Sequence, residues 1–111
     1  MTKLTPLTIV ARRKGKFVAA ALQRLIRFLQ DNSLDFSVDR ISLDEHGLDF
    51  EKKIDLHQVT SGLLLSIGGD GSMLKLVEQA VLHNLPILGI NCGKVGFLAD
   101  LSIDNLQELK L

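Results

Sequence analysis

One apolar run that ends in glycines constrains the fold more than any other part of the chain. Residues 62–67, Gly-Leu-Leu-Leu-Ser-Ile, are followed by Gly68-Gly69-Asp70-Gly71. An apolar run of this length that ends in glycines is typical of a buried strand stopping at a sharp turn, and the apolar residues beyond it recur at helical spacing. The sequence therefore predicts a strand, a glycine turn and then a helix over residues 72–84.

The glycine turn is a candidate anion site. Glycines allow positive φ angles and close approach of a ligand, while the free N–H groups of the following helix attract anions such as phosphate. Asp70 is unusual there, because a carboxylate repels an anion unless a cation or a reacting proton lies between them. The Walker spacing G-x-x-x-x-G-K-[ST] is absent, and Leu74 stands where the dinucleotide fingerprint has its third glycine or alanine. From this turn alone, a ligand site and a plain structural connection both remain open.

A second glycine loop follows the next apolar run. Residues 86–88 are Pro-Ile-Leu, and residues 89–98 are G-I-N-C-G-K-V-G-F-L. Two consecutive parallel strands place both loops at the carboxyl edge of one sheet, where open α/β sheets bind their ligands. The two loops are therefore expected to form one site.

Together, G-G-D-G-S-x-L at residues 68–74 and N-x-G-x-x-G-F-L at residues 91–98 resemble the motifs of the NAD kinases. The likeness covers the layout of the whole chain, with motif identity confined to residues 68–75 and 89–98. Ser72 stands where the family more often has threonine. The resemblance implies phosphoryl transfer from ATP, or from polyphosphate in some members, to the 2′-hydroxyl of NAD, giving NADP. Mg²⁺ or another divalent cation is expected with ATP.

The same resemblance implies roles for six residues. Asp70 is the expected catalytic residue, which accepts or orients the hydroxyl proton. The expected substrate-binding residues are Gly69 and Gly71 through their backbone, Lys75 through its charge, Phe97 as a ring against adenine, and Asn91, which supports its own loop. Structural alternatives stay open: Asp70 as a helix N-cap, Lys75 as a solvated lysine and Phe97 as a core residue. No protein ligand for a metal is expected, since the three histidines lack metal-ligand spacing.

The pattern along the chain predicts an α/β fold. Strands are expected at residues 7–11, 36–41, 62–67 and 86–90, with the second more exposed than the others, and an amphipathic helix at residues 16–30. Residues 42–58 are interpreted as a loop with a helical turn, and Ser102 or Asp104 as the cap of a last helix. The expected fold is a Rossmann-like, doubly wound, mainly parallel sheet of about four strands with flanking helices.

Charge is unevenly distributed although the formal net charge is zero. Residues 1–30 contain seven Lys or Arg and no acidic residue, whereas residues 31–55 contain eight acidic and three basic residues. The basic residues lack interleaved aromatics, which argues against a nucleic-acid partner. Residues 12–15, Arg-Arg-Lys-Gly, form a loop that either meets nucleotide phosphates or is simply solvated. With one cysteine, no signal peptide and no membrane-spanning run, the sequence favours a cytoplasmic protein.

The predicted domain organisation follows from the length of the chain and from its last residues. A chain of 111 residues predicts one domain, and a helical pattern still continues at Leu111. Residues 1–111 are therefore interpreted as the amino-terminal domain of a NAD kinase, a truncated fragment that lacks the family's β-rich second domain, is inactive alone, and belongs to a homo-oligomer at full length. Two alternatives are a lipid or sphingoid-type kinase of the GGDG class and a non-catalytic nucleotide-binding module.

Overall fold

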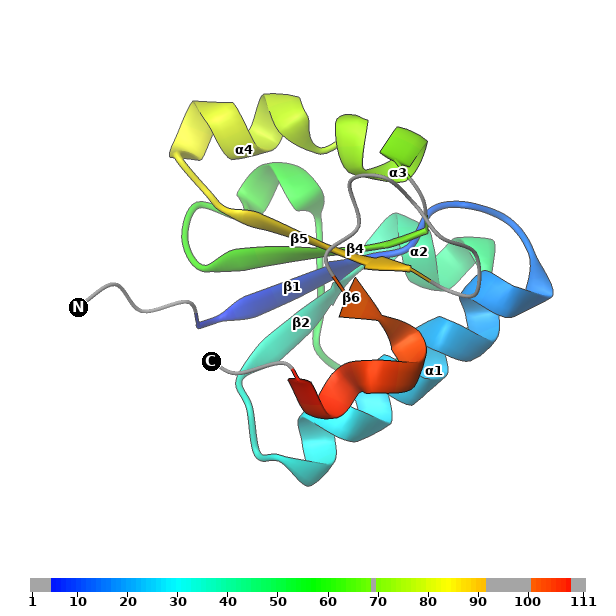
Figure 1. Cartoon of the computed structure of the whole chain (residues 1–111). Coiled ribbons are helices and arrows are strands. Elements are labelled where there is room, and N and C mark those ends of the chain that lie inside the picture. The colour runs from blue at the N-terminus through cyan, green and yellow to red at the C-terminus, as the bar shows by residue number, and fades with distance from the viewer. Residues whose placement is uncertain (1–4, 69, 92–100, 109–111) are drawn as a thin grey trace.

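The structure, a computed structural model, describes residues 5–68, 70–91 and 101–108. Helices lie on both faces of one sheet, as Figure 1 shows. In chain order the elements are β1 (Leu7–Val10), α1 (Lys16–Asp31), β2 (Phe36–Asp39), α2 (Arg40–Glu45), β3 (Lys53–Ile54), η1 (Leu56–Gln58), β4 (Leu63–Gly68), α3 (Asp70–Leu74), α4 (Val77–His83), β5 (Ile87–Asn91), β6 (Leu101–Ser102) and η2 (Ile103–Glu108). The two η elements are 3₁₀ helices.

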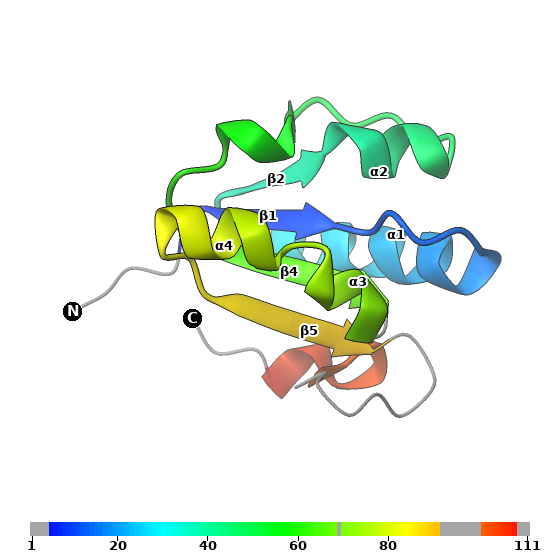
Figure 2. The same cartoon turned by 90° about the horizontal axis from the view of Figure 1, so that it is seen from above.

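The strands pair in the order β3-β2-β1-β4-β5-β6, and each of these pairs is parallel. This is the strand order of the Rossmann fold. Figure 2 shows the arrowheads of β1, β2 and β5 pointing toward the same edge. The predicted Rossmann-like sheet is confirmed, with β1, β2, β4 and β5 at the four predicted places. The sequence does not predict strands β3 and β6, because each has only two residues and so shows no periodicity.

Each face of the sheet has its own core, because alternate strand residues point to opposite faces. Leu7 and Ile9 of β1 pack in one cluster with the buried stripe of α1, which consists of Val18, Ala21, Leu22, Leu25 and Leu29. The next strand residue, Val10, lies in a second cluster with Leu76 and Ala80. Burial on both faces explains why the central strands are almost continuously apolar.

The region around β2 differs from the prediction. The strand is present, but it ends at Asp39 and is buried, with Phe36 3% and Val38 0% exposed. It is buried because it lies between β1 and β3, and it ends because the Asp39 carboxylate accepts a hydrogen bond from the Ser42 N–H (3.0 Å) and caps α2. Residues 40–58 therefore contain α2, β3 and η1, a more ordered segment than the expected loop with one helical turn.

The single helix predicted over residues 72–84 is two helices. Between α3 and α4, the Leu76 N–H donates to the Met73 carbonyl (3.0 Å), three residues earlier. Such a bond tightens the turn. Leu76 is 1% exposed and packs in the core below α4, whereas Lys75 lies at the exposed turn between the helices. Helical spacing alone does not distinguish one helix from two that share a buried face.

The last described element is a 3₁₀ helix at the place where the sequence predicts a helix. The Ser102 hydroxyl accepts a hydrogen bond from the Asp104 N–H (3.2 Å), so Ser102 is the cap of η2. Asp104 instead pairs with Arg24 of α1, with 2.9 Å between Asp104 Oδ1 and Arg24 Nη1. This exposed ion pair links η2 to the long helix.

Candidate active site at the strand ends

The candidate site lies where the sheet changes its direction of winding. From β1 the chain crosses through α1 to β2, and from β4 it crosses through α3 and α4 to β5 on the opposite face (Figure 1). Because β1 and β4 are neighbours, the connections leave their carboxyl ends in opposite directions. Open α/β sheets bind ligands in the crevice that this leaves.

The glycine turn lies at the end of β4, as predicted. Gly68 has φ 141°, and a Cβ at this position would lie 2.6 Å from the Ser72 hydroxyl oxygen. Both the dihedral angle and the close approach of Ser72 therefore require glycine. A Cβ on Gly71 would meet nothing within 4 Å, so the space beside this residue is open. The turn thus combines Gly68, where a side chain does not fit, with Gly71, where the backbone is open to a ligand.

The two glycine motifs meet at this edge. Gly68, the last residue of β4, is in register with Asn91, the last residue of β5. The backbone of Asp70 begins α3, while its side chain lies outside what the structure describes. Gly69 and Phe97 also lie outside the described residues. Of the six predicted site residues, the structure therefore brings Gly71, Lys75 and Asn91 to the strand ends together with the Asp70 backbone.

A small recess lies between the end of β1 and the turn between α3 and α4. Its volume is about 20 Å³, room for about one water molecule. Its walls are Val10, Arg12, Arg13, Ser66, Ser72, Lys75 and Leu76. Two hydroxyls and three cationic side chains thus converge beside the glycine turn.

Arg12 is fixed by a buried carboxylate. Its Nε and Nη2 donate to Asp39 Oδ2 (2.8 Å) and Oδ1 (3.0 Å), and the Asp39 side chain is fully buried. Asp39 Oδ2 also accepts hydrogen bonds from the Ser42 N–H and hydroxyl. These bonds raise the pKa of Arg12 above its usual value, because Asp39 stabilises the charged guanidinium. Arg12 is therefore a cation across the physiological pH range.

Asp39 occupies the strand end where Rossmann dinucleotide-binding proteins carry an acid that binds the ribose. Here both carboxylate oxygens are already engaged by Arg12 and Ser42. Asp39, the last residue of β2, thus has a structural role: through Arg12 it holds the loop after β1. Sequence reasoning missed this role, although the spacing of Asp39 and Ser42 is that of a helix N-cap and the third residue of its helix.

A larger cleft adjoins the recess, since Arg12 and Lys75 line both. Its volume is about 450 Å³, within the range of small-molecule sites. It runs between α4 and the segment from β2 to η1, and its other lining residues are Asp39, Ile41, Asp55, Leu56, His57, Glu78, Gln79 and Leu82. Gln79 joins the two sides by donating from its Nε2 to the Val59 carbonyl (2.8 Å).

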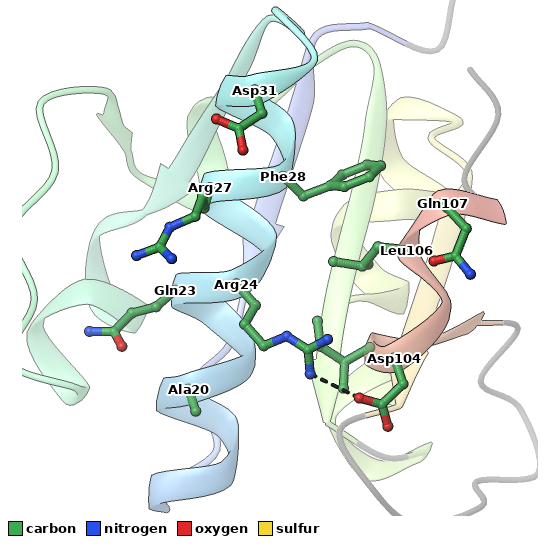
Figure 3. Close-up of a pocket in the computed structure, with 10 residues that line it drawn as sticks. Ala20, Gln23, Arg24, Arg27, Phe28, Asp31, Asp104, Leu106 and Gln107 are labelled. Atoms are coloured by element: carbon green, nitrogen blue, oxygen red, sulfur yellow. Dashed lines mark hydrogen bonds and ion pairs between the residues drawn. The ribbon is translucent and has the colours of Figure 1, made fainter.

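A cavity of about 560 Å³ lies elsewhere, between α1 and η2 (Figure 3). Phe28 and Leu106 contribute apolar surface to it, and the pair Arg24 and Asp104 crosses it. This cavity lies between elements on the face of the sheet opposite α3 and α4 (Figure 1), away from the glycine turn. It therefore forms no part of the candidate site.

Two further features concern the described residues only. Among them, no three His, Cys, Asp or Glu side chains are grouped so as to bind a metal ion. No helix that the structure describes has the length and apolar character needed to cross a membrane.

Comparison with known proteins identifies similar chains. Residues 7–110 match the family model described as ATP-NAD kinase N-terminal domain. The chain is 36% identical over 111 residues to the NAD kinase of Pseudomonas putida strain GB-1, covering 97% of this chain and 37% of that protein. It is 30% identical over 104 residues to the NAD kinase of Nitrosospira multiformis, covering 92% of this chain and 35% of that protein. The chain thus spans about one third of the length of these curated relatives.

Proposed function

This chain belongs to the NAD kinase family, and we propose that it is the amino-terminal domain of an enzyme that phosphorylates NAD at the 2′-hydroxyl of its adenosine ribose, giving NADP. The observation that carries this proposal is the meeting of the Gly68 turn with Asn91 at the switch point of the sheet, in a chain that matches the family over residues 7–110. The relatives extend well beyond the part that matches this chain, and a region corresponding to that extension is proposed to complete the dinucleotide pocket.

In the proposed reaction with ATP, the bond between the γ-phosphorus and the β–γ bridging oxygen breaks, and a bond forms between that phosphorus and the ribose 2′-oxygen. The products are ADP and NADP. The hydroxyl proton passes to the Asp70 carboxylate, which acts as general base. Because the transition state of phosphoryl transfer is loose, the main tasks of the protein are alignment and charge stabilisation.

The other predicted residues receive binding roles. Backbone N–H groups at Gly69 and Gly71 contact phosphate, and the open space beside Gly71 supports close approach of a ligand. Lys75 contributes positive charge from its exposed position at the turn. Asn91 supports the second glycine loop, and Phe97 stacks on adenine.

The divalent cation is proposed to enter with ATP. Mg²⁺ is commonly bound by substrate phosphates together with one or two carboxylates. When bound, it neutralises charge on the transferring phosphoryl group. Polyphosphate is the alternative donor. We further propose that the enzyme is cytoplasmic and homo-oligomeric.

The test is a substrate panel on the full-length enzyme. NAD, NADH and a sphingoid base are each incubated with Mg²⁺ and either ATP or polyphosphate, and the phosphorylated products are separated by chromatography. Formation of NADP is the expected result. Phosphorylation of the sphingoid base alone would instead identify a lipid kinase, and absence of any product would favour a non-catalytic nucleotide-binding module.

A further inference from the structure

We propose that the loop after β1 forms a subsite for the phosphate chain of the phosphoryl donor. In this subsite Arg13, together with Lys75, contacts the phosphates, and the pair Arg12 and Asp39 positions the loop. The inference rests on the proposed function. It adds the end of β1, which contains neither glycine motif, to the site.

The charge around the recess supports an anionic ligand. Arg12, Arg13 and Lys75 line it, and the described lining residues include no carboxylate. Arg12 is paired with Asp39, but the side chains of Arg13 and Lys75 make no ion pair with any residue that the structure describes. Like charges around one recess repel each other, and a bound anion removes that repulsion. Two net positive charges therefore remain for a ligand.

The loop is built as a rigid support. The N–H of Ala11 donates to the Ser42 hydroxyl (2.7 Å), and its carbonyl accepts a hydrogen bond from His46 Nε2 (2.7 Å). The backbone N–H and carbonyl of Ala11 are thus both held by residues at the start and end of α2. Asp39 in turn holds the side chain of the next residue, Arg12. A loop that is merely solvated has no need of buried partners. Groups fixed before binding lose less entropy when the ligand arrives.

The recess also has the right neighbours for a phosphoryl donor. Ser66 of β4 and Ser72 of α3, which line it, come from either side of the glycine turn. The recess itself holds about one water molecule, so the phosphate chain lies over its mouth, beside Arg13 and Lys75, and from there reaches the turn where Asp70 begins α3. ATP and polyphosphate share this chain of phosphates. With ATP, the adjoining cleft of about 450 Å³ offers space for the nucleoside, against Ile41, Leu56 and Leu82.

The first experiment measures the binding of phosphates directly, in an assay that does not depend on turnover. Tripolyphosphate is titrated by calorimetry into the 111-residue chain and into the full-length enzyme, each as wild type, Arg13→Gln and Lys14→Gln. Lys14 is the matched control, since it is the next residue of the loop, is 86% exposed and lies 3.6 Å from Glu45. Arg13→Gln should weaken binding about tenfold in both proteins, and Lys14→Gln less than twofold. Equal affinity of wild type and Arg13→Gln would overturn the subsite, whether or not the enzyme turns over.

The second experiment identifies the ligand by kinetics. In the full-length enzyme, Arg13→Gln should raise the KM of ATP or polyphosphate about tenfold and leave the KM of NAD within twofold, and Arg13→Lys should restore most of the loss. A rise in the KM of NAD alone would show that the recess binds the pyrophosphate of the dinucleotide, contrary to the proposal. Competition with tripolyphosphate and ADP separates the donors: ADP should compete more strongly if the cleft binds a nucleoside. An inactive wild type would refute the proposed function, while the calorimetric result still decides the subsite.

Arg12 and Asp39 are positioning residues, and their variants need a readout beyond stability. Arg12→Lys retains the charge but loses the two-bond contact with Asp39. At a temperature well below its thermal midpoint, it should raise the donor KM about fivefold with the NAD KM unchanged. A lower thermal midpoint with both KM values unchanged would show that the pair serves the fold alone.

Discussion

At the scale of single residues, Asp39 illustrates how a buried charge is stabilised and then used. Its carboxylate accepts hydrogen bonds from Arg12 and from two groups of Ser42, so that each of its buried oxygens has at least one donor. The same bonds fix the start of the loop after β1. A residue that looks like one polar position in an alternating strand therefore connects a strand end, a helix cap and a cationic loop.

Replacing Asp39 by alanine should destabilise the domain by about 3 kcal/mol. The change removes the cap of α2 and leaves Arg12 without its partner. The value is at the low end for a buried pair, because the Arg12 side chain is 34% exposed. Urea denaturation followed by circular dichroism measures the loss. The control is Asp44→Ala at an exposed position on the same helix, which should change the unfolding free energy by less than about 0.5 kcal/mol.

In the full-length enzyme, Asp70→Asn should reduce kcat at least about a hundredfold while the dissociation constant for NAD stays within about tenfold. The amide preserves the shape of the side chain and removes the proton acceptor. Single-turnover kinetics and equilibrium titration with NAD separate the two quantities, with Asp44→Asn as the control. A variant with more than half the wild-type rate would contradict a general-base role for Asp70.

At the scale of elements, the Gly68 turn joins β4 to α3 in a conformation that only glycine adopts readily. Gly68→Ala should cost about 2 kcal/mol of stability, since it adds strain at φ 141° and places a Cβ 2.6 Å from Ser72 Oγ. Gly71→Ala is the matched comparison, because its Cβ would meet no atom within 4 Å. It should keep the thermal midpoint yet lower turnover of the full-length enzyme, as the methyl group fills space proposed for the ligand. Equal midpoints for both variants would contradict this account.

The elements with strong periodicity were predictable, and those set by single tertiary contacts were not. The stripe of α1 and the apolar runs of β1, β4 and β5 repeat over enough residues to specify their structure. The break between α3 and α4 depends on the burial of Leu76, and the burial of β2 depends on the short strand β3 beside it. Neither neighbour can be read from local sequence.

The candidate site was predictable to a similar degree. The two glycine motifs indicate that the ends of β4 and β5 meet, and the register of Gly68 with Asn91 agrees. The catalytic and binding roles remain predictions. The network from Asp39 to Ala11 was not predictable, because its partners Ser42 and His46 lie 31 and 35 residues from Ala11 in the chain. Only the fold brings them to the same strand end.

At the scale of the whole molecule, the described surface contains several large apolar side chains. The exposed ones are Phe17, Ile41, Leu74, Val77, Val81 and Leu82. Four of them, Leu74, Val77, Val81 and Leu82, lie on α3 and α4. Single exposed apolar residues are normal, whereas grouped ones favour association.

The last prediction is that the 111-residue chain folds as it stands but has no detectable NAD kinase activity. Two buried clusters, one on each face of a six-stranded sheet, provide the core for folding. The proposed reaction needs the ribose hydroxyl to be aligned with Asp70, and the relatives named NAD kinase are almost three times as long as the part that matches this chain. Lost alignment alone removes several kcal/mol of catalysis. The exposed residues of α4 should also promote self-association.

Circular dichroism, NADP formation with ATP and Mg²⁺, and the mass in solution by light scattering check the three parts of this prediction. Val81→Ser with Leu82→Ser should reduce the mass toward that of a monomer without changing the spectrum, because Val81 is 75% and Leu82 is 71% exposed. The full-length enzyme, assayed in parallel, verifies that the assay detects turnover. Robust NADP formation by a monomer of this chain would contradict the prediction. It would mean that the edge of one Rossmann-like sheet aligns both substrates without any further part of the pocket.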